Sequence, residues 1–185
     1  AQDLKLGRQV AIKVLPAGNA ASTEAIERFR REARTASALN HPNIIMIHEV
    51  IEAPEAAAIV MELVEGMTLR ELASSGEQPA LESVLHWCRQ LASALAVAHR
   101  NQLIHGDLKP ENVMLVTRDA PRAVLIDFGL ACMHDAPSLT ATGTCLGSPS
   151  YLAPERLLGQ PHGARSDLYA AGVIVPMDAA APGAS

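Results

Sequence analysis

Apolar residues recur three or four positions apart through residues 81–100, and this spacing predicts a long amphipathic helix. The positions that form the apolar stripe are Val84, Leu85, Cys88, Leu91, Leu95 and Ala98. Trp87 and His99 lie in the same stretch, and we expect them to be core or boundary residues rather than catalytic ones. The helix should bury the scaffold beneath the polar segment that follows it.

Two further stretches have helical character. Residues 23–39 carry an approximate apolar face among charges, with Ser22 or Thr23 as the N-cap. A shorter helix is expected to begin at Thr68, and the small residues 74–76 should break it.

Runs of apolar and β-branched residues predict strands at residues 9–15, 44–50 and 56–63. Gly7 should make the turn before the first of these strands. An acidic turn at residues 52–55 should join the other two.

Two short apolar runs, residues 113–116 and 123–126, flank a polar turn and predict a β-hairpin. This hairpin would bring Asp107, Asn112 and Asp127 to one end of its sheet. Two acids and an amide, with a lysine nearby, suit an oxygen-seeking divalent ion, a phosphate and a hydroxyl that needs a base.

Two other polar residues have competing interpretations. His105 is a tempting acid or base, because histidine titrates near neutrality. Lys13 interrupts an apolar strand, and a buried lysine is costly unless it is paired. From the residues alone, an edge-strand lysine whose ammonium group reaches water is the simpler alternative.

The composition is that of a globular chain, because 185 residues with 49% hydrophobic and 19% charged content suffice for one domain with a real core. The net charge of −5 argues against a nucleic-acid surface and gives no reason to expect membrane contact. No run approaches the ~18 apolar residues of a membrane span, although a longer parent chain could carry one. Cys88, Cys132 and Cys145 lack metal-ligand spacing and are expected to be free thiols in a reducing cytoplasm.

Several segments resemble motifs of the protein kinases, in the order and spacing of that family. They are the catalytic loop (105–112), the metal-binding triplet (127–129), the third strand (10–13), the substrate-positioning segment with its closing Ala-Pro-Glu (147–155) and the start of the central helix (166–174). The resemblance covers roughly residues 3–175 and indicates a bacterial, eukaryotic-like Ser/Thr protein kinase.

The resemblance implies an α+β, two-lobed protein-kinase-like fold with a small β-rich lobe and a mainly helical large lobe, both incomplete. Residues 1–64 would form the small lobe without its first strand and glycine-rich loop. Residues 65–175 would form the large lobe through the start of its central helix. Pro176 falls where that helix should continue, so we expect the helix to end there and residues 176–185 to be disordered.

The resemblance also implies roles for the polar residues around the hairpin. Asp107 would orient and deprotonate the acceptor hydroxyl, and Lys109 would neutralise the transferring phosphoryl group. Asn112 and Asp127 would hold Mg²⁺ or Mn²⁺. By the same resemblance, His105 is structural.

The small lobe would bind ATP. Lys13 would hold the α- and β-phosphates while paired to Glu32. Glu27 is the competing partner, but its place nearer the helix start suits that role less.

The adenine ring would lie between the two lobes. Ala11 would be its roof and Met114 its floor, Met61 would be the gatekeeper, and the Glu62 carbonyl and Val64 amide would bind the adenine edge. For the two methionines, ordinary core packing is the alternative that residue type alone favours.

Thr140 and Thr142 lie in a segment that resembles an activation loop, and they are the candidate phosphorylation sites. A phosphate there usually needs an arginine partner, and Gly106 stands where the family usually has arginine. We therefore predict weak dependence on phosphorylation of this loop. Ser148 occupies a position that favours Ser or Thr acceptors over Tyr, and Asp167 would brace the catalytic-loop backbone.

The implied function is transfer of the γ-phosphoryl group of ATP to Ser or Thr hydroxyls of proteins. Since parts of the family pattern are missing at both ends, we expect this polypeptide alone to be weak or inactive. A nucleotide-binding pseudokinase or scaffold is one alternative, favoured by Gly106 and opposed by the retained Asp107 and Asp127. A non-functional fragment is the other, and the expected helix end at Pro176 favours it.

Overall fold

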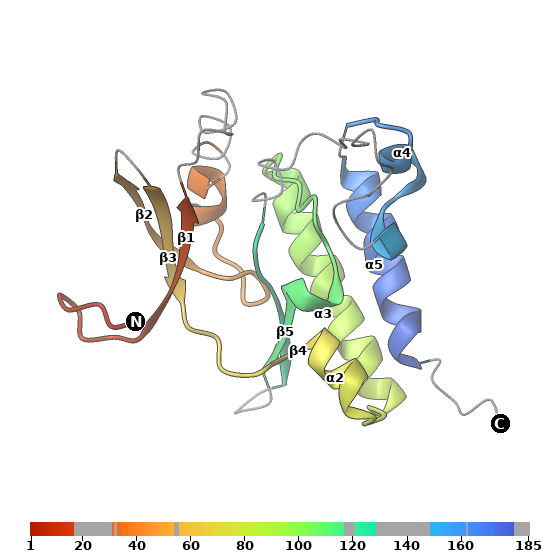
Figure 1. Cartoon of the computed structure of the whole chain (residues 1–185). Coiled ribbons are helices and arrows are strands. Elements are labelled where there is room, and N and C mark those ends of the chain that lie inside the picture. Colours follow the sequence, from red (N-terminus) through yellow and green to blue (C-terminus); the bar gives the residue numbers. More distant parts are fainter. Residues whose placement is uncertain are drawn as a thin grey trace.

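The computed structural model has one sheet on the left of Figure 1 and the longer helices on the right, with a second small sheet beside those helices. It describes residues 1–16, 31, 33–53, 56–116, 121–128, 149–161 and 163–179. Among the helices in these ranges, none is long and apolar enough to cross a bilayer.

The first sheet is antiparallel and consists of β1 (Val10–Pro16), β2 (Ile47–Ala53) and β3 (Ala56–Glu62), in the order β1-β3-β2. Three strands were expected here, and the described part of the chain confirms them. Before β1, Gly7 has φ +69° and its N–H donates to the Asp3 carbonyl at 2.8 Å, so the predicted turn is confirmed as well.

The bounds of β2 differ from the prediction of residues 44–50 with a turn at 52–55. Ile44 forms a parallel bridge to Leu125 instead of joining β2, and β2 continues through Ala53. The apolar residues Ile44 and Ile45 therefore bond to Leu125 of the second sheet, a partner that strand propensity cannot distinguish.

Only the end of the helix predicted at residues 23–39 belongs to the described ranges. Residues 33–37 are helical, and the side chains of Ala33 and Ala36 are buried. The proposed N-cap, Glu27 and Glu32 lie outside the described residues.

The second sheet contains β4 (Met67–Thr68), β5 (Val113–Val116) and β6 (Arg122–Leu125), in the order β4-β5-β6. The β5–β6 pair confirms the predicted hairpin, with Val113 opposite Leu125 and Val116 opposite Arg122. The two-residue strand β4 was not predicted, because a strand that short has no detectable alternation.

The helices are α2 (Leu69–Ser75), α3 (Leu81–Arg100), α4 (Pro154–Leu157) and α5 (Ala164–Ala179), with short 3₁₀ turns η1 (Pro110–Asn112) and η3 (Pro149–Tyr151). The bounds of α3 agree with the predicted residues 81–100. Helix α2 begins with a capping box between Thr68 and Glu71 and ends at Gly76, whose φ is +77°.

The prediction that the last helix ends at Pro176 is wrong, because α5 extends to Ala179. Proline removes one backbone N–H donor and strains the preceding turn, a cost of about 3 kcal/mol. A proline can therefore bend or weaken a helix without ending it at that residue. The expected boundary of a disordered tail at residue 176 is therefore also wrong for residues 176–179.

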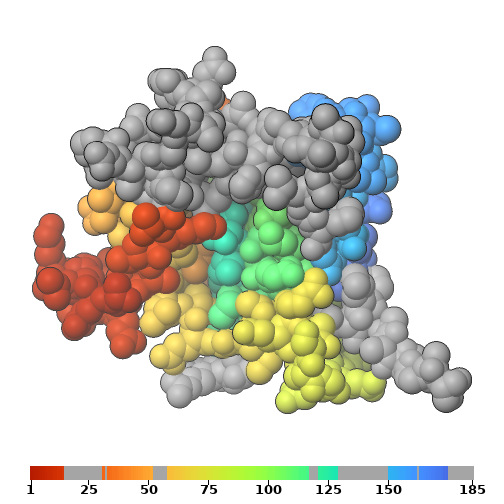
Figure 2. Space-filling view, in the orientation of Figure 1, coloured from red at the N-terminus to blue at the C-terminus, as the bar shows by residue number. Residues whose placement is uncertain are grey.

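The main apolar core lies where α3, α5 and the second sheet meet. Its fully buried members include Ala94, Leu95, Ala98, Val113 and Leu125. Figure 2 shows the green and teal segments, which include β5, at the surface between the red first strand and the blue helices. The loop and hairpin that carry the polar residues are thus supported from beneath and open on one side.

The first sheet is joined to the hairpin by residues 43–45. Leu125 N–H donates to the Asn43 carbonyl and Ile45 N–H donates to the Leu125 carbonyl, both at 2.9 Å. The Asn43 side-chain amide donates to the Ala123 carbonyl at 2.7 Å. These bonds fix the first sheet relative to β6, the strand that leads to Asp127.

Candidate active site

His105 is fully buried in the loop between α3 and β5. Its Nε2 donates to the Ile126 carbonyl at 3.0 Å, its Nδ1 accepts from the Asp107 N–H at 3.4 Å, and its ring lies 4.7 Å from that of Phe128. Burial lowers the pKa of His105, an effect larger than the opposing attraction of Asp167 and the other nearby carboxylates. His105 is thus a neutral structural residue rather than the acid or base that its residue type suggested.

Asp167 on α5 holds the backbone of the same loop. Its Oδ2 accepts from the His105 N–H and its Oδ1 from the Gly106 N–H, both at 2.9 Å, and His99 Nε2 donates to Oδ2 at 2.8 Å. These contacts confirm the predicted brace. The role of His99 in orienting Asp167 was missed, because residues 68 positions apart share no local pattern.

Gly106 has φ +76°, in the left-handed region that other residues avoid. Both amides bonded to Asp167 lie at this turn, so the brace and the left-handed backbone occur at the same point. Glycine adopts this geometry without steric strain, which gives a physical reason for its presence in this chain.

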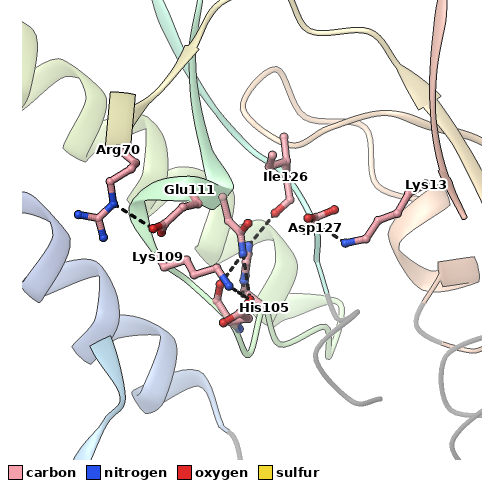
Figure 3. A network of polar contacts seen from close by, with 9 residues as sticks. Lys13, Arg70, His105, Lys109, Glu111, Ile126 and Asp127 are labelled. Carbon is pink, nitrogen blue, oxygen red and sulfur yellow. Dashed lines mark hydrogen bonds and ion pairs between the residues drawn. The ribbon is translucent and has the colours of Figure 1, made fainter. Parts of the chain in front are cut away.

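Asp107, Lys109 and Asn112 are joined by hydrogen bonds within the loop, and Figure 3 shows Lys109 beside His105 and Glu111. Lys109 Nζ is 2.6 Å from Asp107 Oδ2, and the Asn112 amide donates to the Asp107 carbonyl at 2.7 Å and to its Oδ2 at 3.2 Å. The Asp107 side chain is 46% exposed, so its carboxylate is oriented by two neighbours and still reachable by a substrate.

Asp127 follows β6 and has φ +62°, a conformation that aspartate tolerates better than most residues. The Ile126 N–H donates to the Asn112 carbonyl at 3.0 Å, which places the segments carrying Asn112 and Asp127 side by side. The predicted meeting of Asp107, Asn112 and Asp127 at one end of the hairpin is confirmed.

The donor atoms suit a hard divalent cation. Asn112 uses its side-chain nitrogen for both bonds to Asp107. Its side-chain oxygen, Oδ1, is therefore a potential metal ligand together with the Asp127 carboxylate. Magnesium commonly takes one or two carboxylate ligands and completes its shell with phosphate and water, so this donor set fits Mg²⁺.

Lys13 lies opposite this cluster on β1. Its Nζ is 2.9 Å from Asp127 Oδ2, with side chains about one-third exposed. The ion pair with Asp127 gives the partly buried ammonium group of Lys13 a partner of opposite charge, which a buried charge needs. Its predicted pairing with Glu32 falls outside the described residues and stays a prediction.

A second apolar cluster lies between β1–β3 and the hairpin. It combines Met61 from β3 and Val124 from β6 with the partly buried Ala11, Val64 and Met114. The residues assigned to the two faces of an adenine ring are therefore close together. Glu62 makes two hydrogen bonds to Met46. Its N–H donates to the Met46 carbonyl, and its side-chain Oε1 accepts from the Met46 N–H.

The family model for the protein kinase domain matches residues 1–177. The chain belongs to the protein kinase family. Its α+β architecture, with a small β-sheet lobe and a mainly helical lobe, agrees with the expected two-lobed fold.

Curated bacterial kinases are among the relatives. The chain is 41% identical over 175 residues to the serine/threonine-protein kinase PrkC of Bacillus subtilis, covering 95% of this chain and 27% of that protein. It is 40% identical over 184 residues to the serine/threonine-protein kinase PknB of Mycobacterium leprae, covering 95% and 29%. It is 41% identical over 177 residues to the serine/threonine-protein kinase pkn2 of Myxococcus xanthus, covering 94% and 21%. The chain thus spans less than a third of the length of these relatives.

Some predicted residues of this kinase domain cannot be placed. Thr140, Thr142 and Ser148 lie outside the described residues. The segment resumes at η3, where Tyr151 is buried, and the Ser166 hydroxyl on α5 donates to Glu155 Oε1 at 2.8 Å. A backbone hydrogen bond at Glu155 is the largest cause that lowers the pKa of this carboxyl group. The hydrogen bond from the Ser166 hydroxyl is the second cause and lowers it further.

Arg70 was also missed. It joins α2 to the catalytic loop through Glu111 and to η3 through Tyr151. An exposed arginine after a helix start gives no signal in a single sequence. Only the meeting of three separate elements reveals this contact.

Proposed function

We propose that this kinase domain transfers the γ-phosphoryl group of ATP to Ser or Thr hydroxyls of protein substrates. The observation that carries the proposal is the placement of Asp107, Lys109 and Asn112 beside Asp127 and Lys13. The names of the relatives, which are serine/threonine-protein kinases, support the acceptor class. Since ATP is a cytoplasmic nucleotide, we propose a cytoplasmic location for this domain.

Asp107 acts as the base for the acceptor hydroxyl. Its carboxylate is held by Lys109 and Asn112, so an incoming hydroxyl can donate to it without reorganising the loop. Lys109 Nζ lies next to the carboxylate and can neutralise negative charge that develops on the transferring group.

Lys13, Asn112 and Asp127 bind the phosphate end of the nucleotide. A bound Mg²⁺ would be held by Asn112 and Asp127, and it supplies charge neutralisation of the phosphates. In the described structure Lys13 is paired with Asp127, so nucleotide binding must exchange this ion pair for contacts to phosphate. A pair that is about one-third exposed contributes about 1 kcal/mol or less, so the exchange costs little.

The second apolar cluster provides the adenine subsite. Ala11 and Met114 contact the two faces of the ring, Met61 limits its depth, and the Glu62 carbonyl and Val64 N–H bind its edge. The joint placement of Ala11, Met61, Val64 and Met114 in that cluster supports this assignment. Planar aromatic ligands gain most of their affinity from such apolar walls.

A nucleotide-binding pseudokinase or scaffold is the second candidate. Gly106 favours it, because the chain lacks the arginine that usually follows the catalytic-loop histidine. The oriented, exposed Asp107 opposes it, because a protein that only binds nucleotide has no use for a base at that place.

Two measurements on the same protein test the proposal. A thermal melt with and without Mg-ATP should give a cooperative transition that moves upward with nucleotide. Transfer of labelled phosphate to a Ser-containing protein mixture should fall by roughly 10²–10⁴-fold in Asp107→Asn, while the nucleotide-induced shift in Tm persists. A Tm shift with equal, background transfer by wild type and Asp107→Asn would instead establish the pseudokinase.

A further inference from the structure

The turn at residues 41–45 joins the first sheet to the hairpin along the outer edge of β6. Asn43 is buried in this turn, and both its main-chain carbonyl and its side-chain amide are hydrogen-bonded to β6. His41 holds Asn43 in place. The His41 Nδ1 accepts from the Asn43 N–H, and its main-chain carbonyl accepts from the Ile44 N–H, both at 3.1 Å. The position of the turn against β6 therefore depends on His41.

The two ring nitrogens of His41 have different roles, which fixes the protonation state of the ring. A backbone N–H can only donate, so the Nδ1 that receives the Asn43 N–H carries a lone pair. Nε2 lies 3.1 Å from the Ser93 hydroxyl of α3 and carries the proton of the neutral ring. A second proton would go to Nδ1, where it would face the Asn43 N–H. The hydrogen bond between His41 and Asn43 therefore exists only while the ring is neutral.

The charged groups beside the turn oppose a second proton on His41. Burial lowers the pKa of His41, and the charge of Arg100 on α3 lowers it further. From β6, Arg122 Nη1 donates to the carbonyl of Pro42, the residue after His41, at 2.8 Å. Both groups are cations, so a protonated ring adds a positive charge beside two others. Loss of the bond to Asn43 and this repulsion both act to move the turn away from β6.

We propose that protonation of His41 loosens the joint between the first sheet and the hairpin and thereby weakens nucleotide binding. The inference rests on the proposed function and adds a regulation of the same site. Lys13 belongs to β1, whereas Asp127 follows β6, so the two sides of the phosphate site are held together across this joint. Mg-ATP should therefore bind more weakly as the pH falls below the ordinary histidine pKa of about 6.5.

A purely structural role for His41 makes a different prediction, because its loss would then act equally at every pH. Asparagine separates the two roles. An asparagine side-chain oxygen accepts readily from the N–H two residues later, as Nδ1 does here, but it does not titrate. Alanine has no acceptor at all. His41→Asn should therefore behave like the neutral protein at every pH, and His41→Ala like the protonated one.

Hydrogen exchange of the protein without nucleotide tests the joint directly. The amides of Asn43, Ile45 and Leu125 report it, because they make the hydrogen bonds of the turn and of β6. The protection factor of wild type divided by that of His41→Asn should fall about fivefold between pH 7.5 and 5.5. Titration of His105 acts equally in both proteins, so this ratio cancels it. His41→Ala should be weakly protected at both pH values.

Calorimetry with Mg-ATP tests the effect on the nucleotide site. The Kd of wild type divided by that of His41→Asn should be near one at pH 7.5 and about five at pH 5.5. Protonation of the nucleotide itself is common to both proteins and cancels. Ser93→Ala keeps the titrating Nδ1 and should retain the wild-type pH dependence. His48→Asn is the matched control, since His48 on β2 contacts Arg8 and not the turn, and it should also retain it.

The two measurements keep this inference separate from the proposed function. If Mg-ATP does not bind at any pH but the protection ratio falls as expected, the proposed function fails and the proton-dependent joint stands. If Mg-ATP binds and the protection ratio is the same at both pH values, the proposed function stands and the role of His41 fails. A protection ratio that falls while the Kd ratio stays constant would also overturn the inference, because the joint would then not regulate the site.

Discussion

Asp167 Oδ1 accepts a hydrogen bond at 2.9 Å from the N–H of Gly106, a residue 61 positions earlier in the chain. The other oxygen accepts from His105 and His99. A nearly fully buried carboxylate on α5 thus takes up the orphan donors of the catalytic loop. Asp167 therefore helps to hold the loop conformation that presents Asp107, together with the contacts from Lys109 and Asn112.

Asp167→Asn should destabilise the protein strongly. The amide keeps one acceptor oxygen but turns an NH₂ group toward a backbone donor, leaving buried donors unpaired. We expect the free energy of unfolding to fall by about 2–4 kcal/mol, measured by urea denaturation. The exposed substitution Glu77→Gln is the control and should change little. An unfolding free energy for Asp167→Asn close to that of Glu77→Gln would contradict the brace.

Replacing Gly106 and Gly172 by alanine should have opposite effects. Gly106 has φ +76°, so Gly106→Ala places a side chain in the left-handed region and should cost about 1 kcal/mol. Gly172 lies within α5 with no atom within 4 Å of an added Cβ, so Gly172→Ala should stabilise by about 0.5–1 kcal/mol. Denaturant melts of the two variants give the comparison, and changes of the same sign would refute it.

Stability should decrease as the pH falls below the ordinary histidine pKa of about 6.5. Burial lowers the pKa of His105 in the folded protein, so below that pH the unfolded chain binds a proton that the folded chain does not. The loss approaches about 1.4 kcal/mol per pH unit until the folded pKa is reached, and above pH 7.5 it is absent.

His105→Gln removes this contribution, so its unfolding free energy should depend less on pH between 7.5 and 5.5 than that of wild type. His41 has a pKa lowered by burial and by Arg100, so a smaller slope should remain and decrease further in a His41→Gln background. Equal slopes for wild type and His105→Gln would show that His105 is protonated in the folded protein as readily as in the unfolded chain, contrary to the lowered pKa.

Lys13→Met should weaken Mg-ATP binding while leaving stability almost unchanged. The ion pair with Asp127 is one-third exposed and contributes about 1 kcal/mol or less to folding. A charge-assisted contact to phosphate is stronger, so we expect a roughly 10–100-fold rise in Kd by calorimetry. Lys5→Met, an exposed lysine, should leave Kd as it is. Parallel losses of stability and affinity would instead assign Lys13 to the scaffold.

Local patterns explain what the sequence could predict. The bounds of α3 follow from its apolar stripe, and the β5–β6 hairpin follows from two apolar runs around a polar turn. The meeting of Asn112 and Asp127 is a direct geometric result of that hairpin. The resemblance to kinases then supplied the expected role of each residue.

The contacts that the sequence could not predict join residues with no shared periodicity. Arg70 and Tyr151 are 81 positions apart, and His99 and Asp167 are 68 apart. Ile44 appeared to belong to a strand of the first sheet but pairs with Leu125. Pro176 appeared to end a helix that the structure continues to Ala179. For Arg70, His99 and Ile44, tertiary contacts decided what local propensity left open.

The hydrogen bonds between residues 43–45 and Leu125 also restrict how the first sheet can move relative to the hairpin. The first sheet cannot separate from the hairpin on that side without breaking two backbone hydrogen bonds and the hydrogen bond from the Asn43 side chain to the Ala123 carbonyl. A movement of β1–β3 away from the hairpin would therefore be a rotation about this fixed side, with residues 63–66, which connect β3 to β4, changing their backbone angles. Met114 and Asp127 would then stay with the hairpin while Ala11 and Lys13 move away, so the two walls of the proposed adenine subsite would separate.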